Sequence, residues 1–174
     1  MYTQMNYLNN INPGFHILFI PSNNEYERLL DGVANNGNIT FVNMGKPFDI
    51  KVPAFVSKNS PDKNDILFIK GMLPKHSFNR KLYPVSDKLI FTIYKMLKEN
   101  DFVVFEPAGV DWEGLEKTAE FCYNYCLKDS NKRIVLIEPP LSNRAPEKQE
   151  LYAVDSCIMV KFSEWYSSKL VQTI

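Results

Sequence analysis

Six short apolar segments alternate with helical patterns, and this alternation constrains the fold of the chain more than any other feature. Most of the segments are rich in β-branched and aromatic residues and are apolar at consecutive positions, as strands are when helices cover both faces of a parallel sheet. Strands that alternate with helices imply right-handed crossovers, so we predict an α/β fold in three layers, with a mainly parallel sheet of about six or seven strands. The segments are FHILFI (15–20), ITFVNM (39–44), DILFIK (65–70), FVVFEP (102–107), RIVLIEP (133–139) and CIMVKF (157–162).

The segments between these strands predict amphipathic helices over residues 86–99 and 112–128, with Ser86 and Asp111 as the N-caps. A short helix is predicted over 146–154, where Pro146 suits a first helical position. The proline-containing segments 45–64 and 71–85 lack periodicity and are predicted to be loops. The apolar stripes of the two long helices are Leu89, Ile90, Ile93, Tyr94 and Leu97, and Trp112, Leu115, Ala119, Cys122 and Cys126.

Length and composition indicate one globular domain over residues 1–174, because 174 residues suffice for a single sizeable core and 45% of them are hydrophobic. Lys plus Arg and Asp plus Glu are equal at 20 each, so bulk charge does not require a nucleic acid or an anionic membrane as partner. Cys122 and Cys126 lie one helical turn apart within an apolar stripe, which favours reduced core thiols over a metal site. No metal ligand set is predicted.

The start of the chain has neither the basic residues nor the apolar run of a signal peptide, and no apolar stretch approaches the roughly 20 residues that span a bilayer. We therefore expect a cytoplasmic protein without a membrane partner.

The first strand runs directly into a helix through Ser22, Asn23, Asn24 and Glu25, at the place where many nucleotide-binding folds carry a phosphate loop. Such a loop needs glycines whose N–H groups surround the phosphates and a lysine that neutralises them, and the turn has neither. Ser22 and Glu25 instead have the spacing of a capping box, which satisfies the free N–H groups of a helix start. Glu25 and Glu27 would also repel a triphosphate at this helix end.

The order of elements resembles that of KaiC-type ATPases of the RecA superfamily. Asn12-Pro13-Gly14 before FHILFI resembles the family's entry into the first strand, and EYERLLDGVANNG resembles the helix after its phosphate loop. DFVVFEP resembles the Walker B strand, with Glu106 where the family usually has Asp, and RIVLIEPP resembles the sensor-type strand that follows. ELYAVDSCIMVKF and SSKLVQTI resemble the late helix-to-strand passage and the next strand. A Rossmann-like strand order would give nearly the same alternation, so the sequence leaves both orders open.

The resemblance implies a P-loop ATPase domain that lacks the Walker A motif. In active members, the loop Lys and Ser/Thr bind phosphate and magnesium, the Walker B carboxylate supports the metal, and a Glu near the end of the second strand activates water. Here only Glu106 corresponds, and the second strand ends in Met44, Gly45 and Lys46. We therefore expect no ATP hydrolysis, no cofactor, and a non-catalytic role in association with an active ATPase, copies of the chain, or another protein.

Two further patterns suggest other functions. Glu106 and Glu138 should lie at the carboxyl edge of the sheet, where open α/β sheets bind ligands, so a small Rossmann-like enzyme or ligand-binding protein is an alternative. Each glutamate precedes a proline, which also suits a simple strand end. Residues 70–83 gather Lys70, Lys75, His76, Arg80 and Lys81 around Phe78 and Tyr83, a mixture that suits a nucleic-acid backbone and its bases, or a solvated loop.

Overall fold

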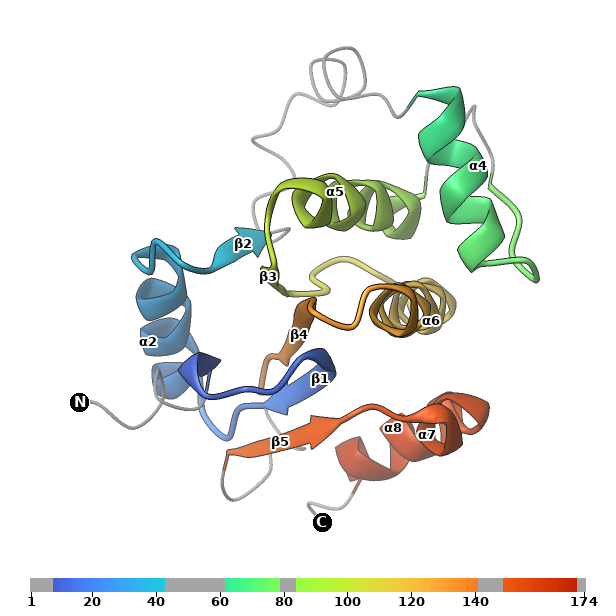
Figure 1. The fold of residues 1–174 in the computed structure, drawn as a ribbon. Helices are drawn as coiled ribbons and strands as arrows, with labels where there is room; N and C mark the ends of the chain where they lie inside the picture. Colours follow the sequence, from blue (N-terminus) through green and yellow to red (C-terminus); the bar gives the residue numbers. More distant parts are fainter. Residues whose placement is uncertain (1–7, 43–61, 79–83, 141–148, 172–174) are drawn as a thin grey trace.

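The computed structural model describes residues 8–42, 62–78, 84–140 and 149–171, with side chains up to Lys169. These residues form an α/β fold in which one five-stranded sheet lies between helices (Figure 1). In chain order the elements are β1 (Gly14–Phe19), α2 (Asn23–Ala34), β2 (Thr40–Val42), α4 (Lys63–Met72), α5 (Val85–Glu99), β3 (Phe102–Phe105), α6 (Trp112–Lys128), β4 (Arg133–Glu138), β5 (Glu150–Ala153), α7 (Ser156–Val160) and α8 (Phe162–Val171).

The strand order in the sheet is β2-β3-β4-β1-β5. The first four strands are mutually parallel, and β5 pairs antiparallel with β1 at one edge. Phe19 of β1 is level with Glu138 of β4, and Phe105 of β3 is level with Leu136 of β4. The carboxyl ends of β1, β3 and β4 therefore meet at one edge of the sheet.

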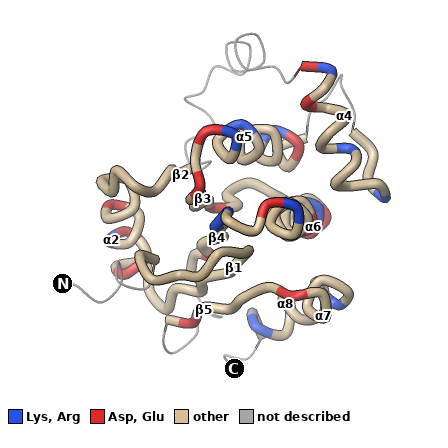
Figure 2. Tube along the Cα trace, viewed as in Figure 1, with Lys and Arg blue, Asp and Glu red and all other residues tan. Residues whose placement is uncertain are grey.

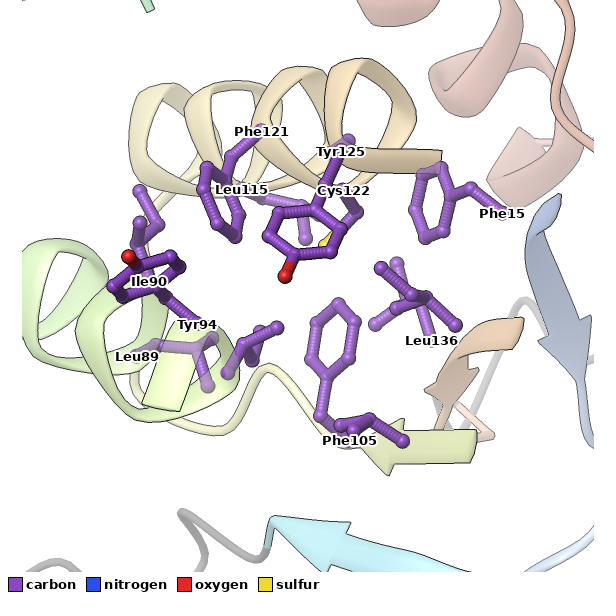
Figure 3. Close-up of a cluster of buried hydrophobic side chains, with 14 of the residues drawn as sticks. Phe15, Leu89, Ile90, Tyr94, Phe105, Leu115, Phe121, Cys122, Tyr125 and Leu136 are labelled. Atoms are coloured by element: carbon purple, nitrogen blue, oxygen red, sulfur yellow. The ribbon is translucent and has the colours of Figure 1, made fainter. Parts of the chain in front are cut away.

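Two hydrophobic clusters cover the two faces of the sheet. Helix α2 packs on one face against Leu18, Val104 and Val135. The opposite face carries α5, α6 and α8, and α4 packs on the outer side of α6 (Figure 1). Figure 3 shows the larger cluster, where Phe15, Phe105 and Leu136 from the sheet meet side chains of α5 and α6.

The cysteines divide between the core and the surface. Cys122 is fully buried in the larger cluster, and burial raises the pKa of its thiol well above the ordinary value. Cys126 is partly buried against the same cluster, which confirms the packing role predicted for this pair. Cys157 is exposed on α7 and does not lie in a strand as predicted.

Four predicted elements are wrong, and the sheet of the described residues has five strands where six or seven were predicted. Residues 65–70 lie in α4, 157–162 lie in α7 and the start of α8, and 150–153 form β5 within the predicted helix 146–154. The final segment, read as a strand, continues α8 as far as Val171. Short apolar runs fit either a strand or a buried helix, so their capping residues decide. Asp62 and Asp65 make a full capping box that begins α4, and the Asp155 side chain accepts from the backbone N–H of Ile158 to begin α7.

The two long helices agree with the prediction, and one N-cap does not. Asp111 caps α6, since its Oδ1 accepts from the backbone N of Gly114 at 2.7 Å. Helix α5 begins after Pro84, so Ser86 lies in its first turn and is not the cap. Ser86 faces Gly114 so closely that a Cβ on the glycine would lie 2.6 Å from the Ser86 Cβ. The absence of a side chain at 114 therefore lets the starts of α5 and α6 touch.

We predict that Gly114→Ala lowers the free energy of unfolding by about 1–3 kcal/mol, because the added methyl group overpacks the α5–α6 contact. Urea unfolding followed by circular dichroism measures the change. Gly71→Ala in α4 is the matched control, since a Cβ there has no neighbour within 4 Å. It should leave stability unchanged or raise it by up to about 1 kcal/mol, because alanine has the higher helix propensity. Equal effects of the two substitutions would contradict the close contact.

Candidate functional site

The carboxyl edge of the parallel strands brings together three of the features predicted from the sequence. The turn from Ser22 to Glu25 follows β1, Glu106 follows β3, and Glu138 ends β4. These three strands are neighbours in the order β3-β4-β1. Ligands of open α/β sheets bind at this edge, so its side chains are the candidate site.

The start of α2 is closed by its own side chains. Ser22 is the N-cap, and its Oγ accepts from the backbone N of Glu25 at 3.3 Å. The same hydroxyl donates to Glu25 Oε2 at 3.2 Å. In a full capping box the Glu25 carboxylate would accept from the Ser22 backbone N–H, whereas here it accepts from the Ser22 side chain. Asn23 and Asn24 are exposed in the first turn. The predicted cap is thus present in a modified form.

Glu106 is buried and is held by a tyrosine of α2. The Tyr26 hydroxyl donates a hydrogen bond to Glu106 Oε2. Burial is the main cause that raises the pKa of Tyr26, and the hydrogen bond to Glu106 raises it further. The tyrosine therefore remains protonated and keeps donating to the carboxylate. Sequence reasoning missed Tyr26, although its place one turn after the cap of α2 is a signal that could have found it.

Glu138 is buried on the other side of the sheet. Burial raises the pKa of this carboxyl group from 4.5 to about 7, and nearby Tyr166 of α8 offsets part of the increase. Burial also raises the pKa of Tyr166, as does the charge of Glu138. Glu138 Oε2 and the Tyr166 hydroxyl lie close enough to influence each other, yet neither reaches a hydrogen-bond partner within the described residues. A carboxyl group with a raised pKa at this edge of the sheet is a candidate for an acid/base role.

The two glutamates project to opposite faces of the sheet. Side chains alternate along a strand, and Phe105 and Leu136 both face the larger cluster. Glu106 directly follows Phe105 and so faces α2, whereas Glu138 is two residues beyond Leu136 and faces α8. Their partners agree with this assignment. A carboxylate pair that shares one metal or one proton is thus not formed, and the described residues contain no group of three or more potential metal ligands.

The basic segment is only partly described. Lys70 and Lys75 are exposed, while Arg80 and Lys81 lie outside the described residues. Phe78 packs against Phe91. Figure 2 shows acidic and basic residues side by side on α4, α5 and α6. An aromatic ring packed in this way offers no open platform for a base, and nucleic-acid binding here stays a prediction.

A buried ion pair, which the sequence did not reveal, fixes the segment after α4. Lys117 Nζ of α6 lies 2.5 Å from Asp87 Oδ1 of α5 and also donates to the Ser77 carbonyl at 2.9 Å. The same ammonium lies 3.9 Å from the centre of the Phe78 ring. His76 Nε2 lies 3.0 Å from a carboxylate oxygen of Glu120. Lys117 lies on the side of α6 opposite the predicted apolar stripe, where sequence periodicity expects an exposed residue.

Comparisons with protein-family models, curated proteins and solved structures find no match for this chain. Among the described residues, no helix combines the length and the apolar character needed to cross a membrane.

We predict that Tyr26→Phe lowers the free energy of unfolding by about 1–3 kcal/mol, because it removes a hydrogen bond to a buried carboxylate. A double-mutant cycle with Glu106→Gln, measured by urea unfolding, should give a coupling energy of at least about 0.5 kcal/mol, since the two groups are in direct contact. Glu27→Gln, on the exposed side of the same helix, is the control and should change stability by less than about 0.5 kcal/mol. Additive effects of Tyr26→Phe and Glu106→Gln would refute the interaction.

Proposed function

We propose that the chain is a non-catalytic RecA/KaiC-like domain that acts by association, with an active ATPase related to it, with copies of itself, or with another regulatory protein. The observation that carries this proposal is the hydrogen bond from the Tyr26 hydroxyl to Glu106. In the resemblance, Glu106 takes the place of the carboxylate that supports the metal. A carboxylate binds a hard cation through oxygen atoms that are open to it, and here Oε2 accepts a hydrogen bond from a partly buried tyrosine.

The start of α2 supports the same conclusion. A phosphate at a helix N-terminus binds to free backbone N–H groups. The Glu25 N–H is already bound by Ser22, and the Glu25 carboxylate lies beside it. An incoming triphosphate would meet negative charge in place of a lysine, so both phosphate and metal lose their binding groups.

The strand order argues against the Rossmann-like alternative. In Rossmann and flavodoxin-like sheets, β1 is a neighbour of β2. In this sheet β4 lies between β1 and β3, and β2 is at the far edge. Two strands thus separate β1 from β2, which departs from both the Rossmann and the flavodoxin-like order. The antiparallel β5 departs from an all-parallel sheet.

Association is the activity that such a domain retains after loss of nucleotide chemistry, because the faces that assemble are separate from the phosphate loop. Large apolar side chains remain exposed on several helices and are candidates for contact with a partner. Leu67 of α4, Leu127 of α6 and Val160 of α7 are the most exposed, at 58%, 67% and 84%.

We predict that the purified protein gives no binding heat with magnesium-ATP in a calorimetric titration and no phosphate release. Micromolar, magnesium-dependent ATP binding would overturn the proposal. In Tyr26→Phe the tyrosine hydroxyl no longer binds Glu106, but the phosphate lysine is still missing, so ATP binding should remain absent.

Association itself is tested by sedimentation velocity over a wide concentration range and by co-purification from cells that express the tagged chain. Either self-association or a stoichiometric protein partner is expected. Replacing Leu67, Leu127 and Val160 in turn by Glu should weaken the association at the position that lies in the interface. A monomer at every concentration, with no co-purifying protein, contradicts the proposal.

A second candidate function is a small enzyme or ligand-binding protein that uses the carboxyl edge. It is favoured by the pKa of about 7 for Glu138, since a general base works best when its pKa is near the operating pH. A metabolite screen should then find a ligand that raises the melting temperature of the protein. Glu106→Gln or Glu138→Gln should abolish this thermal shift, while circular dichroism shows that the variant keeps its fold. Absence of any ligand that depends on either residue removes this candidate.

A further inference from the structure

Helix α8 is joined to the sheet by aromatic contacts that surround one ionisable group. Tyr166 and Trp165 of α8 pack on Phe19 of β1, with ring centroids 6.0 and 6.4 Å apart. Trp112 of α6 lies 5.1 Å from the Tyr166 ring. Glu138 is level with Phe19 on the neighbouring strand, and its buried side chain lies near enough to Tyr166 to raise the pKa of that tyrosine. The contact between α8 and the sheet therefore encloses a carboxyl group within an aromatic surface.

We propose that Glu138 and Tyr166 form a proton-dependent latch: protonated Glu138 keeps α8 docked on the sheet, and release of the proton to solvent loosens the helix. This inference does not depend on the proposed function. Among the described residues, two buried polar atoms lack hydrogen-bond partners, Glu138 Oε2 and the Tyr166 hydroxyl, and the two groups lie near enough to affect each other's pKa. Burial without a hydrogen-bond partner disfavours a charged carboxylate in this apolar contact, whereas the protonated carboxyl group leaves no charge there, and the Tyr166 hydroxyl offsets only part of this preference.

The charged groups around Glu138 do little to stabilise its ionised form. On α8 the facing group is Tyr166, while Glu164 of the same helix is exposed. At the start of α6, Asp111 and Glu113 are exposed acids. On the α2 side, Tyr26 is engaged with Glu106. At the β5 edge, Tyr152 donates to Glu150 and accepts from Lys169, so these groups bind one another.

The direction of the pH effect follows from proton binding. The docked state holds the Glu138 proton up to a pKa of about 7, and the ordinary value of 4.5 returns when the group is exposed to water. Docking is therefore strongest below pH 4.5, weakens as the pH rises to about 7, and is constant above it. Between pH 4.5 and 7 the equilibrium constant for docking of α8 therefore falls roughly 300-fold in total.

Hydrogen exchange of the α8 amides tests the latch. After correction for intrinsic exchange rates, protection of α8 should fall by up to about 10-fold per pH unit between 4.5 and 7 and then level off. Amides of β3 should be better protected than those of α8 at every pH, which shows that α8 opens by itself. Tryptophan emission gives a second readout, because both tryptophans of the chain, Trp112 and Trp165, pack against α8 residues or lie on α8.

Three variants complete the test. Glu138→Gln has nearly the same shape without the titration and should abolish the pH dependence. Tyr166→Phe removes the group that lowers the pKa of Glu138, so the level region should begin at a higher pH. Glu164→Gln, on the exposed side of α8, should behave as the wild type. A pH dependence that persists in Glu138→Gln, or α8 protection equal to that of β3, would overturn the latch.

Discussion

Burial of β1, β3 and β4 on both faces is the constraint on which the rest of the structure depends. Helices on each side remove water from these strands, so any polar group at their carboxyl ends must find a partner or change its protonation. Glu106 takes the first course and is held by Tyr26. Glu138 takes the second, and burial raises its pKa. The chemistry at the carboxyl edge is thus a consequence of the way in which the sheet is covered.

The two glutamates have different surroundings because they project from opposite faces. On the α2 side, the hydroxyl of Tyr26 donates a hydrogen bond to the Glu106 carboxylate. On the α8 side, the neighbouring tyrosine does not reach hydrogen-bonding geometry, and the carboxyl group gains from keeping its proton. One edge of the sheet therefore holds both a carboxylate bound by a tyrosine and a carboxyl group whose pKa is raised by burial.

Long, strongly periodic elements were predictable from the sequence, and short apolar runs were not. The spacing of apolar residues gave α5 and α6 nearly to their ends, and Asp111 was correctly placed as a cap. Residues 65–70 and 157–162 read equally well as strands, and the side chains of Asp62 and Asp155, which begin helices, decided otherwise. In the candidate site, the sequence placed Glu106 and Glu138 at strand ends, while their tyrosine partners come from helices distant in the chain.

The sequence by itself determined the α/β class, the apolar strands β1, β3 and β4, the missing phosphate loop and the cap at Ser22, because each depends on neighbouring residues. Tertiary structure decided the strand order, the contact of Tyr26 with Glu106, and the burial of Glu138 beside Tyr166. Those features depend on which side of the sheet each helix covers. Because side chains alternate along each strand, Glu106 then faces α2 and Glu138 faces α8. Local patterns of sequence do not show which helix each glutamate faces.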